Sequence, residues 1–105
     1  MSEEFAISLT RAAGAVTVAL HGEVDVLTVD KVRLALAEAV DQRPDSIVVD
    51  LAGLSFIDST GLGALVFGFQ RARDEGIAFR LAGPSPSVRQ ILVVSGLLEV
   101  VPVSD

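Results

Sequence analysis

The chain has 105 residues, half of them apolar, so it can form one compact domain with a hydrophobic core and has little room for a second. It contains no cysteine, which excludes disulfides, thiolate metal ligands and a catalytic thiol. The formal net charge is -6 and the basic residues are scattered, so direct binding to nucleic acid is not expected. No apolar stretch is long enough for a membrane span and the acidic N-terminus does not resemble a signal peptide, so we expect a cytoplasmic protein.

The first half of the chain predicts two strands, a helix and a third strand. Residues 6–21 contain two runs of alternating apolar residues joined by the short segment 12–14, a pattern typical of a hairpin. Thr28 is a candidate N-cap for a helix, whose apolar residues recur at helical spacing until Pro44 prevents its continuation. The β-branched run at 47–51 is typical of a buried strand.

The next part of the chain predicts a second helix and a fourth strand. The helix should begin near Ser59 or Thr60 and end at Gly76, and residues 77–81 should form the strand. The apolar stripe of this helix is expected to comprise Leu62, Leu65, Val66, Phe69 and Ala72.

A third helix is predicted from its two ends. Ser85 is a candidate N-cap, Pro86 suits the first helical position, and Gly96 suits the residue that follows a helix. The inner face of this helix should carry Val88, Ile91, Leu92 and Ser95. Residues 100–103 could supply a last strand. Strands that alternate with helices predict a single α/β domain over residues 1–105, with a mixed sheet of about five strands flanked by three or more helices.

The segment 54–63 carries the most informative pattern. It places Asp58, Ser59 and Thr60 between a strand and a helix, followed by Gly61. One interpretation is structural, because these side chains accept hydrogen bonds from free amides at a helix start and glycine permits a tight turn. The other is regulatory: a helix N-terminus carries free N–H groups and partial positive charge, so it can accommodate a phosphate on Ser59 without unfolding. Such a phosphate would switch an interface with a docked partner.

The same segment resembles the signature of the STAS domain family, most closely its anti-sigma factor antagonists. Residues 58–63 read Asp-Ser-Thr-Gly-Leu-Gly, as in that signature. Residues 22–25 (Gly-Glu-Val-Asp) resemble the family's turn after the second strand, and 48–51 (Val-Val-Asp-Leu) its central strand. Residues 95–97 (Ser-Gly-Leu) resemble the end of its third helix. These ordered motifs extend the resemblance over residues 15–103, nearly the whole chain.

The resemblance implies a regulator without catalytic activity. In its unphosphorylated form it would bind an anti-sigma factor that is also a serine kinase of the histidine-kinase-like ATPase type, which frees a sigma factor. Phosphorylation of Ser59 would break that complex, and a PP2C-like serine phosphatase would restore it. ATP and magnesium would belong to the kinase, so no cofactor and no metal are expected on this chain. Around Ser59, the phosphorylation-site loop would comprise Asp58, Thr60, Gly61 and Gly63, with Thr60 helping to cap the helix.

Four residues are candidates for contacting this partner. Glu23 and Asp25 are either solvated carboxylates of a turn or, as the resemblance implies, part of the docking surface beside Ser59. Phe67 lies off the apolar stripe of its helix, so it is expected to be exposed, either as an ordinary surface residue or as an anchor for the partner. Leu62 is either a core residue or partner-facing. Because the chain stops soon after the last predicted strand, the terminal helix of many family members is expected to be short or absent.

Two patterns that would indicate an enzyme are incomplete. A triad of Ser59, His21 and an aspartate would be expected with a Gly-x-Ser-x-Gly turn, which the sequence lacks. The glycines at 61 and 63 lack the third glycine of a dinucleotide-binding motif, and no Gly-Lys-Ser/Thr sequence follows a glycine-rich loop. We therefore expect neither catalysis nor nucleotide binding by this chain.

Three alternative functions share the predicted architecture. A receiver domain with Asp50 as phosphoacceptor would need an acidic pair after the first strand and a late lysine, but the only lysine is Lys31, in the first helix. The other two remain open, because a STAS fold also serves as an adaptor subunit of lipid-transport ATPase complexes and as a stress-signalling scaffold. A neighbouring gene for a kinase-like ATPase or a sigma factor would favour the antagonist.

Overall fold

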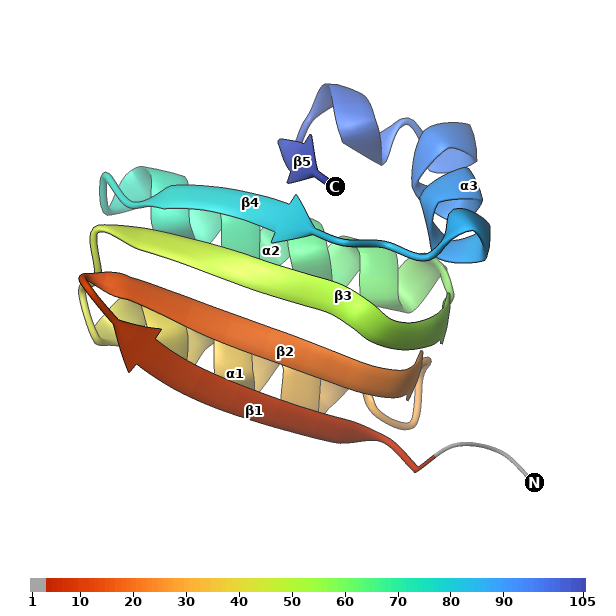
Figure 1. The fold of residues 1–105 in the computed structure, drawn as a ribbon, viewed down its shortest axis with the longest axis horizontal. Helices are drawn as coiled ribbons and strands as arrows, with labels where there is room; N and C mark the ends of the chain where they lie inside the picture. The colour runs from red at the N-terminus through yellow and green to blue at the C-terminus, as the bar shows by residue number, and fades with distance from the viewer. Residues whose placement is uncertain (1–3) are drawn as a thin grey trace.

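The computed structural model describes residues 4–105, in which five strands form one sheet and each strand pairs with the next along the chain. β1 is antiparallel to β2, and the other neighbouring pairs are parallel. The predicted α/β fold with a mixed sheet is confirmed. The elements are β1 (Ala6–Ala12), β2 (Ala15–Val24), α1 (Val29–Asp41), β3 (Ser46–Ile57), α2 (Ser59–Asp74), β4 (Ala78–Ala82), α3 (Pro86–Ser95), a 3-10 helix (Leu97–Glu99) and β5 (Val103–Ser104) (Figure 1).

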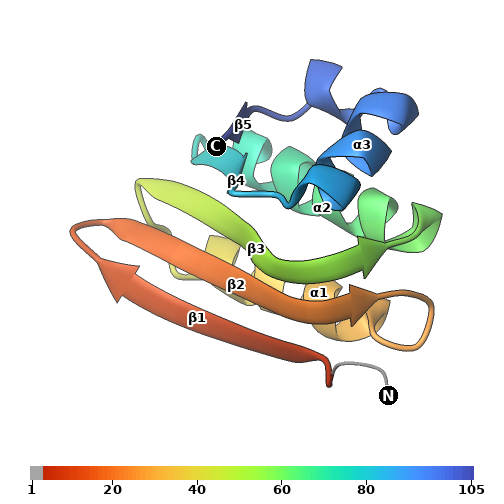
Figure 2. The same ribbon diagram turned by 45° about the vertical axis from the view of Figure 1, so that its right-hand side comes forward.

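Helices α1 and α2 pack side by side against one face of the sheet (Figures 1 and 2). The hydrophobic core lies between that face and the two helices, because alternate side chains of each strand point to the same side. Helix α3 lies near the carboxyl ends of β3 and β4 and buries Val88 and Leu92. Fully buried core side chains include Val18, Leu20, Leu36, Ile47, Val49, Leu65 and Leu81.

The β1–β2 hairpin is confirmed, and its turn consists of Ala13 and Gly14. Both residues have positive φ, 52° and 83° respectively, which is the conformation of a type I′ turn. A Cβ on Gly14 would also lie 2.5 Å from a carboxylate oxygen of the exposed Asp45 side chain, which would have to move. The turn therefore fixes the register of the two strands.

Strand β3 is longer than the predicted run 47–51. It continues to Ile57, beyond the β-branched run, and its parallel ladder with β2 passes through two register shifts, at Ala19/His21 and Gly22/Glu23. These irregularities break the period-2 alternation that would otherwise mark the second half of the strand in the sequence. The strand ends two residues before α2 begins at Ser59.

Helix α2 packs against α1 through small residues as well as through its predicted apolar stripe. Leu65 and Ala72 are fully buried, while Leu62, Val66 and Phe69 are partly buried against the core. Small residues are also buried on this helix, namely Gly61, Ala64 and Gly68. A Cβ on Gly68 would lie 2.8 Å from Leu36 Cδ1, so glycine lets the two helices approach closely.

The ends of α3 are formed as predicted. The Ser85 hydroxyl accepts a hydrogen bond from the Val88 amide at 3.3 Å, with Pro86 as the first helical residue. Gly96 follows the helix in the left-handed conformation. Ser95, by contrast, is exposed rather than on the inner face.

Two further predictions of local structure are wrong. Thr28 occupies the N-cap position of α1, but its hydroxyl donates to the Glu23 carbonyl and accepts from the Asp25 amide, so it fastens the preceding loop instead of capping the helix. The last strand is Val103–Ser104 rather than 100–103. The chain first forms a short 3-10 helix, after which Val101 is buried in the core, so the strand begins later.

Candidate functional site

The candidate site lies where β3 ends and α2 begins. β2 and β3 stay paired up to Val24 and Ile57, and the Asp58 amide then donates to the Val24 carbonyl at 3.1 Å. The two parallel strands therefore have their carboxyl ends next to each other, and the loops that follow them lie side by side (Figure 2). This contact keeps Asp58 outside the helix and makes Ser59 the first residue of α2.

Asp58 is the N-cap of α2. One oxygen of its carboxylate accepts hydrogen bonds from the Gly61 amide at 3.0 Å and from the Thr60 hydroxyl at 2.6 Å. The Thr60 hydroxyl, and then the Gly61 amide, lower the pKa of Asp58 below its ordinary value, because they stabilise the charged form. Of the three successive capping residues in the sequence, Asp58 is the one that caps.

The two hydroxyls beside Asp58 have different environments. The Thr60 hydroxyl donates to the Asp58 carboxylate, so it supports the cap rather than bonding a backbone amide itself. Ser59 is exposed at the N-terminus of α2, and within residues 4–105 its hydroxyl makes no hydrogen bond. Ser59 is therefore the more accessible hydroxyl of the pair.

Gly61 and Gly63 have different roles, although both belong to the predicted loop. Gly61 is buried in the first turn of α2, where an added Cβ would lie 2.5 Å from Ile57 Cγ1 and 2.7 Å from Val24 Cγ1. Gly63 is an exposed residue inside the helix, and its Cβ would meet only Arg33, at 3.8 Å. Gly61 therefore seats α2 on the strand ends, whereas Gly63 does not shape the loop.

Asp25 organises the neighbouring loop between β2 and α1. Its carboxylate accepts from the Leu27 amide at 2.9 Å, and its carbonyl accepts from the amides of Thr28 and Val29. Glu23 is half-buried at the end of β2, with its carbonyl held by Thr28. The loop is thereby held together by hydrogen bonds beside the start of α2.

Sequence analysis missed three exposed apolar residues near the carboxyl ends of β2 and β3. Val26 and Leu27 are 68% and 86% exposed at the tip of the loop after β2. Phe56 is 44% exposed and pairs in register with Glu23. An apolar pair within a turn was the available sequence signal, since turns are usually polar. All three residues lie where β2 and β3 end, close in the chain to the start of α2 or of α1.

The other two partner-binding candidates are half-buried. Leu62 is half-buried and packs against the core. The expectation that Phe67 is exposed is wrong: it is half-buried, with the guanidinium carbons of Arg33 and Arg71 at 5.4 and 5.7 Å from its ring centroid. These distances are typical of cation–π contacts, so the ring links α1 to α2.

Within the described residues there is neither a cluster of metal ligands nor a helix able to span a membrane. Within 4–105, no three His, Asp or Glu side chains lie close enough together to hold a metal ion. None of the helices in this range is long and apolar enough to cross a bilayer. His21 lies on β2 opposite Gly53 of β3.

The fold and site define an α/β domain with a mixed sheet. At the carboxyl ends of its parallel strands it presents a capped helix N-terminus and an exposed serine. The chain belongs to the STAS domain family, which it matches over residues 6–105. It is 33% identical over 100 residues to an anti-sigma F factor antagonist of Paenibacillus polymyxa, which covers 94% of this chain and 86% of that protein.

Several solved structures are similar to this one. An anti-sigma factor antagonist from Mycobacterium paratuberculosis has the same fold, with a TM-score of 0.89, 24% identity and coverage of 99% of this chain and 90% of that one. The phosphorylated form of the Bacillus cell fate determinant SpoIIAA gives a TM-score of 0.71 with 26% identity, covering 95% of this chain and 92% of that one. The recognised family resemblance is confirmed.

Proposed function

We propose that this protein is an anti-sigma factor antagonist whose partner binding is switched off by phosphorylation of Ser59. The observation that carries the proposal is the exposed Ser59 hydroxyl, which makes no hydrogen bond within residues 4–105 and stands at the N-terminus of α2. A kinase can reach such a hydroxyl without unfolding the domain. Its role is regulatory and requires no catalysis by this chain.

Two similarities support the proposal. One relative, which matches most of the length of this chain, is named as an anti-sigma F factor antagonist. One of its similar structures, SpoIIAA, is known in a phosphorylated form. These similarities favour the antagonist over the alternatives of a transport adaptor or a signalling scaffold.

The site also suggests how a phosphate would act. A phosphoserine carries a charge of about -1.5 to -2 at neutral pH, and the positive end of the α2 dipole would lower its cost to the fold. A partner covering Val26, Leu27 and Phe56 would meet this charge together with that of Asp58. Desolvating two adjacent negative groups is costly, so the phosphate would weaken the complex while leaving the domain folded.

The partners follow from this proposal. The protein would bind an anti-sigma factor that is also a serine kinase, and a PP2C-like phosphatase would remove the phosphate. ATP and magnesium would be bound by the kinase. Regulation of a sigma factor would place the protein in the cytoplasm. Glu23, Asp25, Leu62 and Phe67 remain proposed contributors to the interface, the last two through their partly exposed surface.

The test combines mass spectrometry with a binding assay. The chain is incubated with ATP, magnesium and each anti-sigma kinase of its organism, and the modified residue is located by fragmentation. We expect one phosphate on Ser59 and loss of co-elution with the kinase. Ser59→Ala should bind permanently and Ser59→Asp should bind weakly. The control Thr60→Val removes the neighbouring hydroxyl together with its hydrogen bond to Asp58, and should still be phosphorylated on Ser59.

Two results would count against the proposal. If no kinase modifies the chain, the adaptor or scaffold function is favoured. If Ser59→Asp binds as strongly as Ser59→Ala and both remain folded, negative charge at this position does not control the interface.

A further inference from the structure

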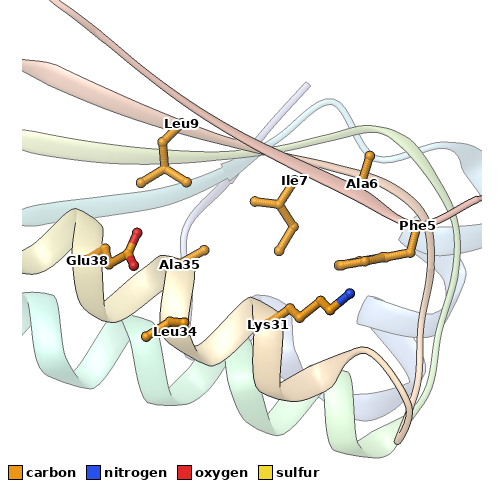
Figure 3. A pocket seen from close by; sticks show the side chains of 8 residues that line it. All are labelled: Phe5, Ala6, Ile7, Leu9, Lys31, Leu34, Ala35 and Glu38. Carbon is orange, nitrogen blue, oxygen red and sulfur yellow. The ribbon is translucent and has the colours of Figure 1, made fainter.

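A groove lies between strand β1 and helix α1, at the edge of the sheet (Figure 3). It has a volume of about 350 Å³. Its apolar lining includes Phe5, Ile7 and Leu9 from the strand side and Leu34 from the helix, with Leu34 62% exposed. This groove is formed by different elements from those of the Ser59 site.

Strand β1 has a free edge beside this groove. It pairs with β2 on one side, and within residues 4–105 no strand pairs with its other side. Edge strands are usually protected from pairing with another chain by proline, by bulges or by several charges. Ala6–Ala12 contains no proline, has an unbroken register with β2, and carries a single charge, at Arg11. The edge is therefore open to a further strand.

The charges at the groove are arranged so that the surface complements itself. Lys31 lies at the Phe5 end of the groove and Glu38 at the Leu9 end, as Figure 3 shows. The two charged residues are seven positions apart on α1, which is about 10 Å along the helix axis. The span from residue 5 to residue 9 is about 13 Å along the strand. The two ends of the groove therefore carry opposite charges, and Ile7 of the strand lies between them (Figure 3).

We propose that a second copy of this chain binds here, with the two β1 strands paired antiparallel about a two-fold axis at Ile7. In such an isologous contact, each residue meets its symmetry-related counterpart. Phe5 of one copy would lie opposite Leu9 of the other, and the apolar lining of each groove, which includes Leu34, would be covered by the other copy. Lys31 of each copy would face Glu38 of the other. The charge pattern favours a second copy as the occupant, because a two-fold rotation exchanges the two ends of the groove.

This dimer would leave the Ser59 site accessible. The site follows β3, at the carboxyl end of the strands, whereas the dimer uses the lateral edge of β1. The inference therefore does not rest on the proposed function. It would give one particle that carries two Ser59 sites.

The test is sedimentation velocity of the full chain over about a thousandfold range of concentration, which reports the dissociation constant of the dimer. We expect a concentration-dependent dimer that Leu34→Glu weakens at least about tenfold, because it places a carboxylate in the apolar lining that the second copy would cover. The matched control is Val94→Glu on α3, which alters a residue that is 76% exposed and distant from the groove and should leave the constant unchanged.

A charge exchange tests the orientation of the two copies. Lys31→Glu and Glu38→Lys should each weaken the dimer, and the double variant should restore it, because the exchanged charges again face opposite ones. Circular dichroism verifies that each variant is folded. A monomer at every concentration would overturn the inference. It would also be overturned by a dimer that Leu34→Glu does not affect, or by a double variant as weak as the single ones.

Discussion

Replacing Gly61 by alanine should destabilise the domain, whereas the same change at Gly63 should stabilise it. At Gly61 the new methyl group would lie 2.5 Å from Ile57 Cγ1 and 2.7 Å from Val24 Cγ1, which belong to fully buried side chains. Overpacking of this kind costs about 1–3 kcal/mol. The higher helix propensity of alanine returns about 1 kcal/mol at most. The expected net loss in the free energy of unfolding is therefore about 1 kcal/mol.

At Gly63 the steric cost is absent, because the nearest atom to the new methyl group would be an Arg33 nitrogen at 3.8 Å. Only the gain in helix propensity remains, about 0.5–1 kcal/mol. Urea denaturation followed by circular dichroism measures both changes. With a slope of about 2 kcal/mol per molar urea, the two midpoints should differ by nearly 1 M. Equal shifts for the two variants would refute the close seating of α2 on the strand ends.

Three further predictions concern Asp58, Ser59 and Phe67. The folded-state pKa of Asp58 is lowered by Thr60 and Gly61, so its contribution to stability is present above the unfolded pKa and is lost as the pH falls below about 4; Asp58→Asn should lose less stability than the natural chain between pH 5 and 3 in urea titrations. Ser59→Asp should change the free energy of unfolding by less than about 0.5 kcal/mol, because charge at a helix N-terminus is tolerated; a shift of the thermal midpoint by many degrees would contradict this. Phe67→Ala should cost about 2 kcal/mol in urea denaturation, through loss of partly buried area and of two cation–π contacts, and an unchanged midpoint would show that the ring does not link the helices.

Most of the fold could be predicted because local patterns agree with the tertiary structure. The Ala13–Gly14 turn, the Ser85 cap and the Gly96 stop are formed by residues within a few positions of one another, so the sequence contains the whole signal. The irregular end of β3 differs, because its register shifts arise from pairing with β2. The same holds for Thr28, whose hydroxyl is used by a loop that only the folded chain brings together.

The candidate site shows the same division. Three successive capping residues predict a helix start, but the contact of the Asp58 amide with Val24 decides which of them caps. The expected exposure of Phe67 failed because Arg33 lies in a different helix, 34 positions earlier in the chain. The apolar tip at Val26 and Leu27 was missed because a short loop has no periodicity to interpret. Long-range contacts therefore limit the prediction of the site more than they limit the fold.

The order of the strands has a consequence for how the chain folds during synthesis. The spatial order β1-β2-β3-β4-β5 repeats the order in the sequence. Each strand from β2 onwards therefore pairs with a strand that has already left the ribosome. No strand has to wait for a distant later segment, which keeps the loops that must close short and favours rapid folding. The hairpin and α1 can cover each other before β3 is complete, so few apolar surfaces remain open to aggregation while the polypeptide is still growing.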